Sequence, residues 1–168
     1  MTKYILFFIG CCILFAPLRS QNVEPIKFVH IGLNEGLSQS TIFGITQDKQ
    51  GNMWFATYNG LNKYNGYDFT VYQHDEHNPH SISNDIIRSC TADRLGKIWI
   101  GTDSGLSFYN ADKDRFENFS SEDRGEQVPI NGIVEFNDHE LLLFSNKKNC
   151  YCSTPKPRSS PVKCRNLS

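Results

Sequence analysis

Short apolar runs alternate with turn residues over the middle of the chain. In the run "IWIG", residues 98–101, apolar residues follow one another instead of alternating with polar ones, which predicts a strand buried on both faces. Segments rich in Asp, Gly, Ser and Asn flank this run and are typical of tight turns. The pattern predicts four short strands in an antiparallel meander. Their expected ranges are 85–92, 97–102, 106–110 and 115–120.

The same pattern occurs twice along the chain. When residues 48–64 are aligned with residues 93–109, seven of seventeen positions are identical, whereas ordinary residue frequencies would leave about one match. The identical pairs are Asp48/Asp93, Gly51/Gly96, Trp54/Trp99, Thr57/Thr102, Gly60/Gly105, Leu61/Leu106 and Tyr64/Tyr109. A period of about 45 residues is typical of few repeat architectures, and one of them is the four-stranded propeller blade.

The predicted blades assign structural roles to the repeated positions. A single four-stranded sheet would leave one face in water, so a doubly buried second strand favours sheets stacked around a channel. In such a stack, Trp54 and Trp99 would fill the space between neighbouring blades. Gly101, which is Ala56 in the first copy, fits a position where two sheets approach closely. The glycines of the two Gly-Leu pairs are expected in tight turns.

The N-terminus predicts export. Lys3 precedes an apolar run over residues 4–16, and the polar segment "PLRS" follows, which is the order of a secretory signal peptide. The run is shorter than the roughly 20 residues that a membrane-spanning helix needs. We predict a signal peptide over residues 1–20, cleaved near Ser20, with an uncleaved anchor as the alternative. The mature chain would be periplasmic or secreted, with no further membrane span.

Six cysteines must then be explained in an oxidising compartment. Cys11 and Cys12 would leave with the signal peptide. Cys90 aligns with Ile45 of the first copy, a position expected for a buried strand residue, and is predicted to be a small core residue. The remaining three are Cys150, Cys152 and Cys164. The segment "CYC" has no second Cys or His pair at zinc-ligand spacing, and the redox state of these residues stays open.

Two groups of metal-ligating residues are weak candidates. His74, His77 and His80 recur at three-residue intervals, but their segment contains Pro, Asn and Ser and predicts an exposed loop without a regular scaffold. Three acidic residues also gather in a later turn: Asp112, Asp114 and Glu117. They lack the Gly and the further oxygen ligands of a calcium loop. We therefore expect a solvated turn there and assign no metal site.

Catalytic signatures are equally weak. The segment "GTDSG", residues 101–105, is similar to the Ser-containing loop of chymotrypsin-like proteases, but Ser104 is Asn59 in the first copy and no His can be placed as its base. No phosphate-binding glycine loop, zinc-protease helix or basic aromatic stripe is present. The formal net charge of −1 also argues against a nucleic-acid partner. No catalytic residue and no cofactor are assigned.

Together these residues resemble a known family. "ITQDKQGNMWFATYNGLNKYNG", "HNPHSISNDII" and "CTADRLGKIWIGTDSGLSFYN" resemble the two-component-regulator propeller repeats in the N-terminal periplasmic sensor part of bacterial hybrid sensor histidine kinases. The opening "FVHIGLNEGLSQSTIFGI" also resembles the start of such a sensor. The resemblance covers residues 28 to about 120. It implies a sensor of glycans or their breakdown products with two large propellers, a small β-sandwich, one membrane span and a cytoplasmic kinase.

The rest of the chain departs from that pattern. Residues 128–149 look like a degenerate blade without the Trp and the Gly-Leu pair, and residues 150–168 are rich in Pro, Ser, Lys and Cys, which favours disorder or a tail foreign to the fold. The predicted fold is an all-β partial propeller of about two to three four-stranded antiparallel blades. The expected organisation is a signal peptide (1–20), an N-terminal strand and lead-in (21–35), blade 1 (36–81), blade 2 (82–123), a degenerate partial blade 3 (124–149) and a tail (150–168).

The resemblance also bears on assembly. In the family, the N-terminal strand, here about Lys27 to Ile31, would complete the last blade and close the ring. A truncated copy would lack that blade and expose apolar blade faces. Because repeat arrays generally need three or more units with capped ends, we expect a marginally stable chain that can self-associate through those faces.

The expected function is that of a truncated sensor. We predict no enzymatic activity for this chain, and an oligosaccharide ligand for the complete sensor. The alternative is a secreted propeller-type carbohydrate-active enzyme or an adhesion or interaction scaffold, since propellers host many functions. Ligand-binding residues stay unassigned. The turn positions that differ between the copies, Tyr58 against Asp103 and Asn59 against Ser104, are where a ligand would be read; exposed tyrosines such as Tyr58 and Tyr67 are also common on ordinary surfaces.

Overall fold

The computed structural model describes residues 25–119, 127–137, 140–146, 150–153 and 164–166. The predicted signal peptide lies outside the described residues. The chain divides into two units, residues 1–30 and residues 31–168. The strand expected over Lys27 to Ile31 is absent, because these residues pair with none of the described strands. A β-strand is held by ladder hydrogen bonds to a neighbour, and sequence pattern alone does not supply that neighbour.

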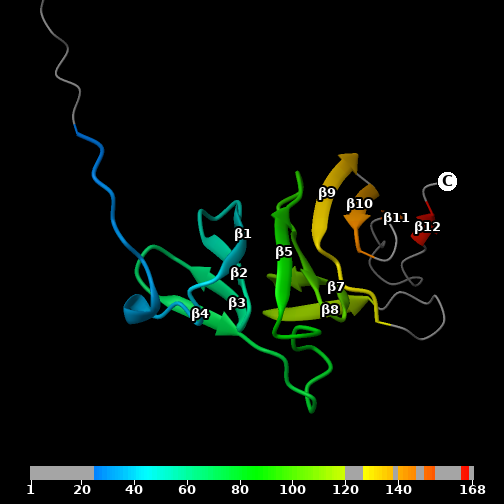
Figure 1. The fold of residues 1–168 in the computed structure, drawn as a ribbon, viewed down its shortest axis with the longest axis horizontal. Coiled ribbons are helices and arrows are strands. Elements are labelled where there is room, and N and C mark those ends of the chain that lie inside the picture. The colour runs from blue at the N-terminus through cyan, green and yellow to red at the C-terminus, as the bar shows by residue number, and fades with distance from the viewer. Residues whose placement is uncertain (1–24, 120–126, 138–139, 147–149, 154–163, 167–168) are drawn as a thin grey trace, which may run out of the picture. The chain divides into compact units, whose positions relative to one another are not determined.

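The second unit contains three antiparallel four-stranded sheets, which we call the first, second and third blades (Figure 1). A short 3-10 helix, Leu33–Glu35, precedes them. The first blade consists of β1 (Ile42–Gln47), β2 (Met53–Thr57), β3 (Gly60–Tyr64) and β4 (Phe69–Tyr72). The second consists of β5 (Ile87–Ala92), β6 (Ile98–Thr102), β7 (Gly105–Asn110) and β8 (Arg115–Phe119). The third consists of β9 (Gly132–Asn137), β10 (Glu140–Phe144), β11 (Cys150–Ser153) and β12 (Cys164–Asn166).

The blades stack through equivalent strands. The first strand of each meander contacts the first strand of the next, so that β1 lies beside β5 and β5 beside β9. This places β1, β5 and β9 as the inner strands, and the fourth strands lie at the outer edges of their sheets, as in a propeller. The predicted all-β fold with antiparallel four-stranded blades is confirmed.

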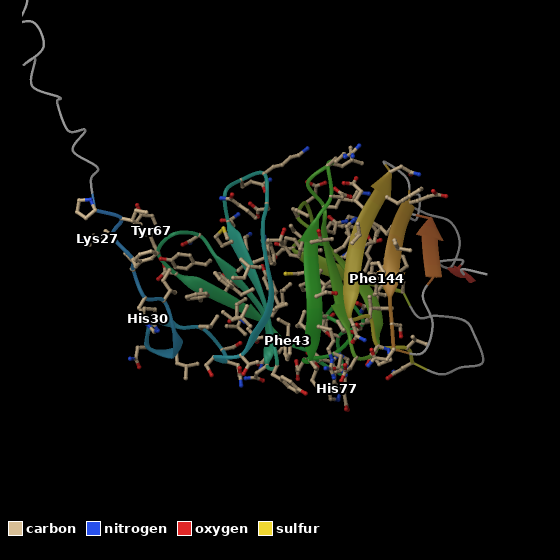
Figure 2. All side chains as sticks on the ribbon, turned by 45° about the horizontal axis from the view of Figure 1, so that its top comes forward. Lys27, His30, Phe43, Tyr67, His77 and Phe144 are labelled. Carbon is tan, nitrogen blue, oxygen red and sulfur yellow. The ribbon has the colours of Figure 1, made fainter. Side chains whose placement is uncertain are left out.

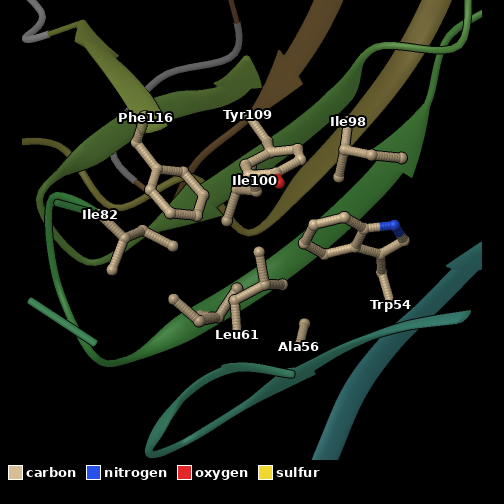
Figure 3. Close-up of a cluster of buried hydrophobic side chains, with 9 residues drawn as sticks. Trp54, Ala56, Leu61, Ile82, Ile98, Ile100, Tyr109 and Phe116 are labelled. Carbon is tan, nitrogen blue, oxygen red and sulfur yellow. The ribbon is translucent and has the colours of Figure 1, made fainter. Parts of the chain in front are cut away.

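Tryptophan fills the first interface between blades (Figure 3). Trp54 is fully buried, and its ring centroid lies 4.8 Å from that of Tyr109 in the second blade. The complete buried cluster is Trp54, Ala56, Leu61, Ile82, Ile87, Ile98, Ile100, Tyr109 and Phe116. It combines side chains of the first blade, the connection and the second blade, which confirms the role predicted for Trp54.

The interface between the second and third blades is also filled by a Trp, but the residues that it meets are aliphatic. Trp99 and Leu106 of the second blade pack against the third blade and the segment that leads into it. The residues they meet there are Ile130, Ile133, Leu141 and Leu143. All five residues of β6 are buried, as the apolar run predicted. The third blade lacks the Trp of the other two, but it supplies enough aliphatic surface to cover Trp99, which is 1% exposed.

Glycine is required where the sheets approach most closely. A Cβ atom on Gly101 would lie 2.4 Å from the backbone oxygen of Ile130 and 2.4 Å from Ser89 Oγ, so no larger residue fits without a shift. The Gly-Leu glycines have a different reason. Gly60 and Gly105 have φ angles of 96° and 128°, which L-residues with a side chain rarely adopt. Both predictions about these glycines are confirmed.

The C-terminal segment differs from its prediction. Residues 150–153 and 164–166 form β11 and β12, and they continue the third sheet outward from β10. Disorder, one of the two expectations for this tail, is therefore wrong for these residues. Without β11, β10 would be an edge strand with a row of unpaired backbone groups. Any extended segment can satisfy such groups, so pairing does not require the apolar alternation that the sequence lacks.

One prediction about buried strand positions holds for only one of the two repeats. Cys90 packs against the first interface, with its Sγ 3.8 Å from the backbone oxygen of Trp54, and burial raises the pKa of its thiol to about 12. It is therefore the small core residue that the alignment predicted. Ile45, its counterpart, is 55% exposed. The difference arises because the first blade covers Cys90, whereas no described residue covers the equivalent face of β1.

Candidate ligand-binding site

The repeated polar residues are occupied by internal hydrogen bonds. Asp48 Oδ2 accepts a bond from Trp54 Nε1, and Asp93 Oδ2 accepts one from Trp99 Nε1, each at 2.9 Å. Burial by itself would raise the pKa of Asp48, but hydrogen bonds from Asn52, Trp54 and Gln50 outweigh it, and the pKa is lowered. These identical positions therefore hold each blade together, and a ligand would have to contact other residues.

A backbone irregularity marks the same place in two inner strands. The pairing register shifts between Ile42 and Gly44 in β1, and between Ile87 and Ser89 in β5. The residues at these shifts are Phe43 and Arg88. A β-bulge re-aims the side chain of the inserted residue and often lies beside a functional site. Figure 2 shows Phe43 at the start of β1, near the second blade.

Each bulge residue contacts a turn residue of its own blade. The ring of Phe43 lies 5.2 Å, centroid to centroid, from that of Tyr58 in the turn between β2 and β3. In the second blade, Arg88 Nε donates to Asp103 Oδ1 at 2.6 Å and Arg88 Nη2 donates to Asp103 Oδ2 at 3.2 Å. Tyr58 and Asp103 are equivalent positions of the repeat. The same two sites thus carry an aromatic pair in one blade and a charged pair in the next.

The third blade carries a further pair at the corresponding positions. Its ladder aligns Gly132 with Phe144, as the second blade aligns Ser89 with Gly101, so Asn131 and Asn146 match Arg88 and Asp103. Asn131 Nδ2 donates to Asn146 Oδ1 at 2.6 Å. An amide pair therefore stands where the second blade has the charged pair.

We call these six residues the inner row: Phe43, Tyr58, Arg88, Asp103, Asn131 and Asn146. Its first two pairs are in contact, because the Arg88 guanidinium carbon lies 6.0 Å from the ring centroid of Phe43 and 5.7 Å from that of Tyr58, within cation–π range. The hydrogen bonds to Asp103 are the main reason that the pKa of Arg88 is raised. The row remains accessible, since Phe43 is 40% and Tyr58 45% exposed.

Neutral polar groups flank the inner row at the same end of the sheets. Gln73 Nε2 donates to Asn59 Oδ1 at 3.0 Å beside the first blade's turn. In the second blade, Ser104 Oγ accepts from Asn84 Nδ2 at 3.0 Å and donates to Gln127 Oε1 at 3.1 Å. Aromatic faces, amides, a hydroxyl and a carboxylate therefore share one end of the sheets, which is suited to a ligand with apolar faces and many hydroxyl groups.

The two tyrosines considered from the sequence are separated by the fold. Tyr58 belongs to the inner row, whereas Tyr67 is 87% exposed in the turn between β3 and β4, at the opposite end of the first blade. The variable turn positions Asn59 and Ser104 lie beside the row. Sequence reasoning missed Phe43 and Arg88, although extending the repeat alignment five residues toward the N-terminus would have aligned them with each other.

The weaker chemical candidates have other surroundings. His77 is 96% exposed in its side chain, His74 Nδ1 lies 2.8 Å from the backbone oxygen of Ile82, and His80 Nε2 lies 3.4 Å from Arg115 Nη1. Within the ranges that the structure describes, no group of three or more His, Cys, Asp or Glu residues is placed to hold a metal ion. The acidic turn residue Asp114 accepts hydrogen bonds from Tyr109 and Tyr72.

None of the helices in the described part of the chain is long and apolar enough to cross a bilayer.

The stacked four-stranded sheets with equivalent Trp anchors define a propeller-type repeat protein. Residues 36–59 match the family described as two component regulator propeller. Over 66 residues it is 40% identical to Histidine kinase P4 of Formosa agariphila, a match that covers 39% of the chain and 5% of that protein.

Solved structures with the same fold extend the match to most of the chain. The extracellular domain of the putative hybrid two component system BT3049 from B. thetaiotaomicron is 26% identical, with a TM-score of 0.69 over 82% of the chain and 20% of that domain. The corresponding domain of BT4673 from the same organism is 16% identical, with a TM-score of 0.61 over 77% of the chain and 17% of that domain. The chain thus spans about a fifth of the domains it matches.

Proposed function

We propose that the chain belongs to the extracytoplasmic sensor region of a hybrid two-component system and that the inner row contributes to an oligosaccharide site. The observation that carries the proposal is that equivalent positions of three successive blades contain three different side-chain pairs at one end of the inner strands. The blade scaffold repeats, but the side-chain pairs of the inner row differ from blade to blade. Such an arrangement is suited to binding, because loops and strand ends on a rigid scaffold usually carry specificity.

The chemistry of the row supports a sugar. The partly exposed rings of Phe43 and Tyr58 offer apolar contact area, and the tyrosine hydroxyl adds a polar group at its edge. Asp103 and Asn146 provide acceptors, and Arg88 and Asn131 provide donors beyond the bonds they make to their partners. Binding sites usually combine apolar lining with a few placed polar groups. In the complete protein, ligand binding at the propeller would be transmitted to a histidine kinase.

The location proposed for this region is outside the cytoplasm. Two observations support it: the N-terminal sequence has the order of a signal peptide, and the solved structures with the same fold are extracellular domains. We also propose the domain organisation expected from the sequence, with the first blade over residues 36–81 and the second over residues 82–123.

The proposal can be tested by titrating the purified chain with oligosaccharides in a calorimeter. Tyr58→Ala should weaken binding about tenfold, a typical loss for a truncated aromatic contact, because it removes one ring of the inner row. Tyr67→Ala is the matched control, since it removes an equally large exposed ring at the opposite end of the same blade. Equal effects of the two substitutions, or no binding by the wild type, would contradict the assignment.

The same titrations address the alternative of a carbohydrate-active enzyme or an adhesion scaffold. Chromatography of the oligosaccharides after prolonged incubation should recover them intact. Shortened products would instead identify a hydrolase or lyase and would overturn the sensor proposal.

A further inference from the structure

We propose that the inner row selects uncharged oligosaccharides and disfavours acidic ones. This inference rests on the proposed function, since it names the ligand class of the same site. It starts from Arg88, the basic residue of the row, which on its own would suggest recognition of a carboxylate or sulfate.

The charge of Arg88 is already compensated by its own blade. Asp103 accepts two hydrogen bonds from it, from Nε at 2.6 Å and from Nη2 at 3.2 Å. This is the two-point geometry in which a guanidinium recognises a carboxylate. A carboxylate or sulfate of a ligand would therefore have to displace Asp103 or approach within reach of its negative charge. The pair is partly shielded from water, with side-chain exposures of 32% for Arg88 and 26% for Asp103, so that charge is only partly screened.

The other pairs of the row carry no charge. Phe43 and Tyr58 form the aromatic pair, and Asn131 and Asn146 form the amide pair. The summed formal charge of the six residues is therefore zero. Such a row offers stacking surfaces and hydrogen-bonding groups, which suit the faces and hydroxyl groups of a neutral sugar.

The connection between the first two blades contains more acidic residues than Lys or Arg residues. Residues 73–86, which lead from the first blade to the second, contain Asp75, Glu76 and Asp85 and no Lys or Arg. The described segments that lead into β1 and β9, residues 37–41 and 127–131, carry no charged residue. Of these residues, Asp85 is placed at the turn beside Tyr58, because its backbone oxygen accepts a hydrogen bond from Gly60 N at 2.7 Å. Like charges brought together without compensation cost affinity, so Asp85 also opposes an acidic ligand.

The test compares matched neutral and acidic probes on the full chain. Wild type and Asp103→Asn would be titrated with hexasaccharides of glucose, mannose and xylose, and with hexasaccharides of galacturonic and guluronic acid. The wild type should bind at least one neutral probe about tenfold more tightly than any acidic one. Asp103→Asn leaves Arg88 without its counter-charge and should strengthen binding of the acidic probes about tenfold.

Asp112→Asn is the matched control, because it removes the same charge from a turn at the opposite end of the second blade. It should leave both affinities unchanged. Tighter binding of acidic than of neutral probes by the wild type would overturn the inference while leaving an oligosaccharide site in place. An Asp103→Asn variant that behaves like Asp112→Asn would overturn the role of the Arg88–Asp103 pair. Binding of no oligosaccharide would contradict the proposed function itself.

Discussion

Equivalent faces of the first two blades have different surroundings. In the second blade, the face toward the first blade is buried: Ile98, Ile100, Tyr109 and Phe116 are each at most 7% exposed. We call the equivalent face of the first blade its front face, and its residues are Ile45, Met53, Phe55, Tyr64 and Phe69. Four of these are only half-buried, and Ile45 is exposed. The two faces share a strand order and a register.

In a repeat fold, whether a residue is buried depends more on the neighbouring blade than on the residue itself. Trp54 covers the second blade. On the front face of the first blade, Phe69 makes ring pairs with Phe55 and Tyr64 of its own sheet, and Gly36 is the neighbour beside it from outside the sheet. Removing apolar area from water contributes about 25 cal/mol per Å². Equivalent residues of the two blades should therefore contribute very differently to stability.

The largest expected effect separates the two faces directly. Ile100→Ala should lower the free energy of unfolding by about 2–5 kcal/mol, because it leaves a cavity in the interface between blades. Phe55→Ala, at the equivalent position of the first blade, should cost only about 1 kcal/mol, since its ring is half-exposed already. Urea unfolding followed by tryptophan fluorescence would measure both. Equal losses would mean that the front face of the first blade is covered in solution.

The next effect tests how closely the second and third blades approach. Gly101→Ala should cost about 1–3 kcal/mol, because its new methyl group meets a backbone oxygen. Gly44→Ala is the matched control at the other interface, where a Cβ atom would lie 3.4 Å from its nearest neighbour, the backbone nitrogen of Cys90. The control should be nearly neutral. A harmless Gly101→Ala would show that the third blade does not pack as described.

A pH-dependent effect should distinguish the polar contacts between the first two blades. Asp114 accepts hydrogen bonds from Tyr109 at 2.6 Å and from Tyr72 of the first blade at 3.0 Å, and the bond from Tyr109 is the main cause that lowers its pKa. A carboxyl group with a lowered folded-state pKa stabilises the fold above its unfolded pKa, about 3.9, and this contribution is lost as the pH falls through the folded-state value.

Asp114→Asn should therefore be less stable than the wild type near pH 7, and the difference should shrink as the pH falls below the unfolded-state pKa of about 3.9. Asn also tolerates the positive φ of 46° at this position, so the substitution separates charge from backbone strain. Urea midpoints between about pH 2 and pH 7 would show the trend, with Asp112→Asn in the same turn as the control. A stability difference that does not change with pH would mean that the contact stabilises the fold through packing and not through the charge of Asp114.

The smallest expected effect concerns assembly. We propose that copies of the chain associate weakly through the front face of the first blade. Ile45→Lys should then raise the concentration at which oligomers appear in light scattering, because it places a charge on that face. Thr70→Lys adds the same charge to the opposite face of β4 and should have no such effect. Identical scattering for both variants would exclude this face as the contact.

The predictions made from the sequence were best where a residue serves its own blade. Trp54, Trp99, Gly101 and the Gly-Leu glycines have the roles that the repeat indicated, because a position fixed in two copies reports a local requirement of strand, turn or interface. The tail was misjudged, because β11 pairs with the backbone of β10 and β12 pairs with that of β11. Ile45 was misjudged, because its exposure depends on whether another blade packs against it, and the repeat pattern does not show which blades are adjacent.

The sequence by itself determined the blade: its period, its strands, its turns and the Trp that fills the interface, since these follow from local patterns repeated after 45 residues. Only the tertiary structure decided which side chains meet at the inner row. Phe43 and Arg88 lie at irregular points of two ladders, and they reach Tyr58 and Asp103 because the strands of each blade pair. Arg88 meets Phe43 only because the two blades stack. Hydrophobic periodicity helps to set the register of a regular ladder. It does not indicate where a ladder is interrupted or which side chains of separate sheets meet.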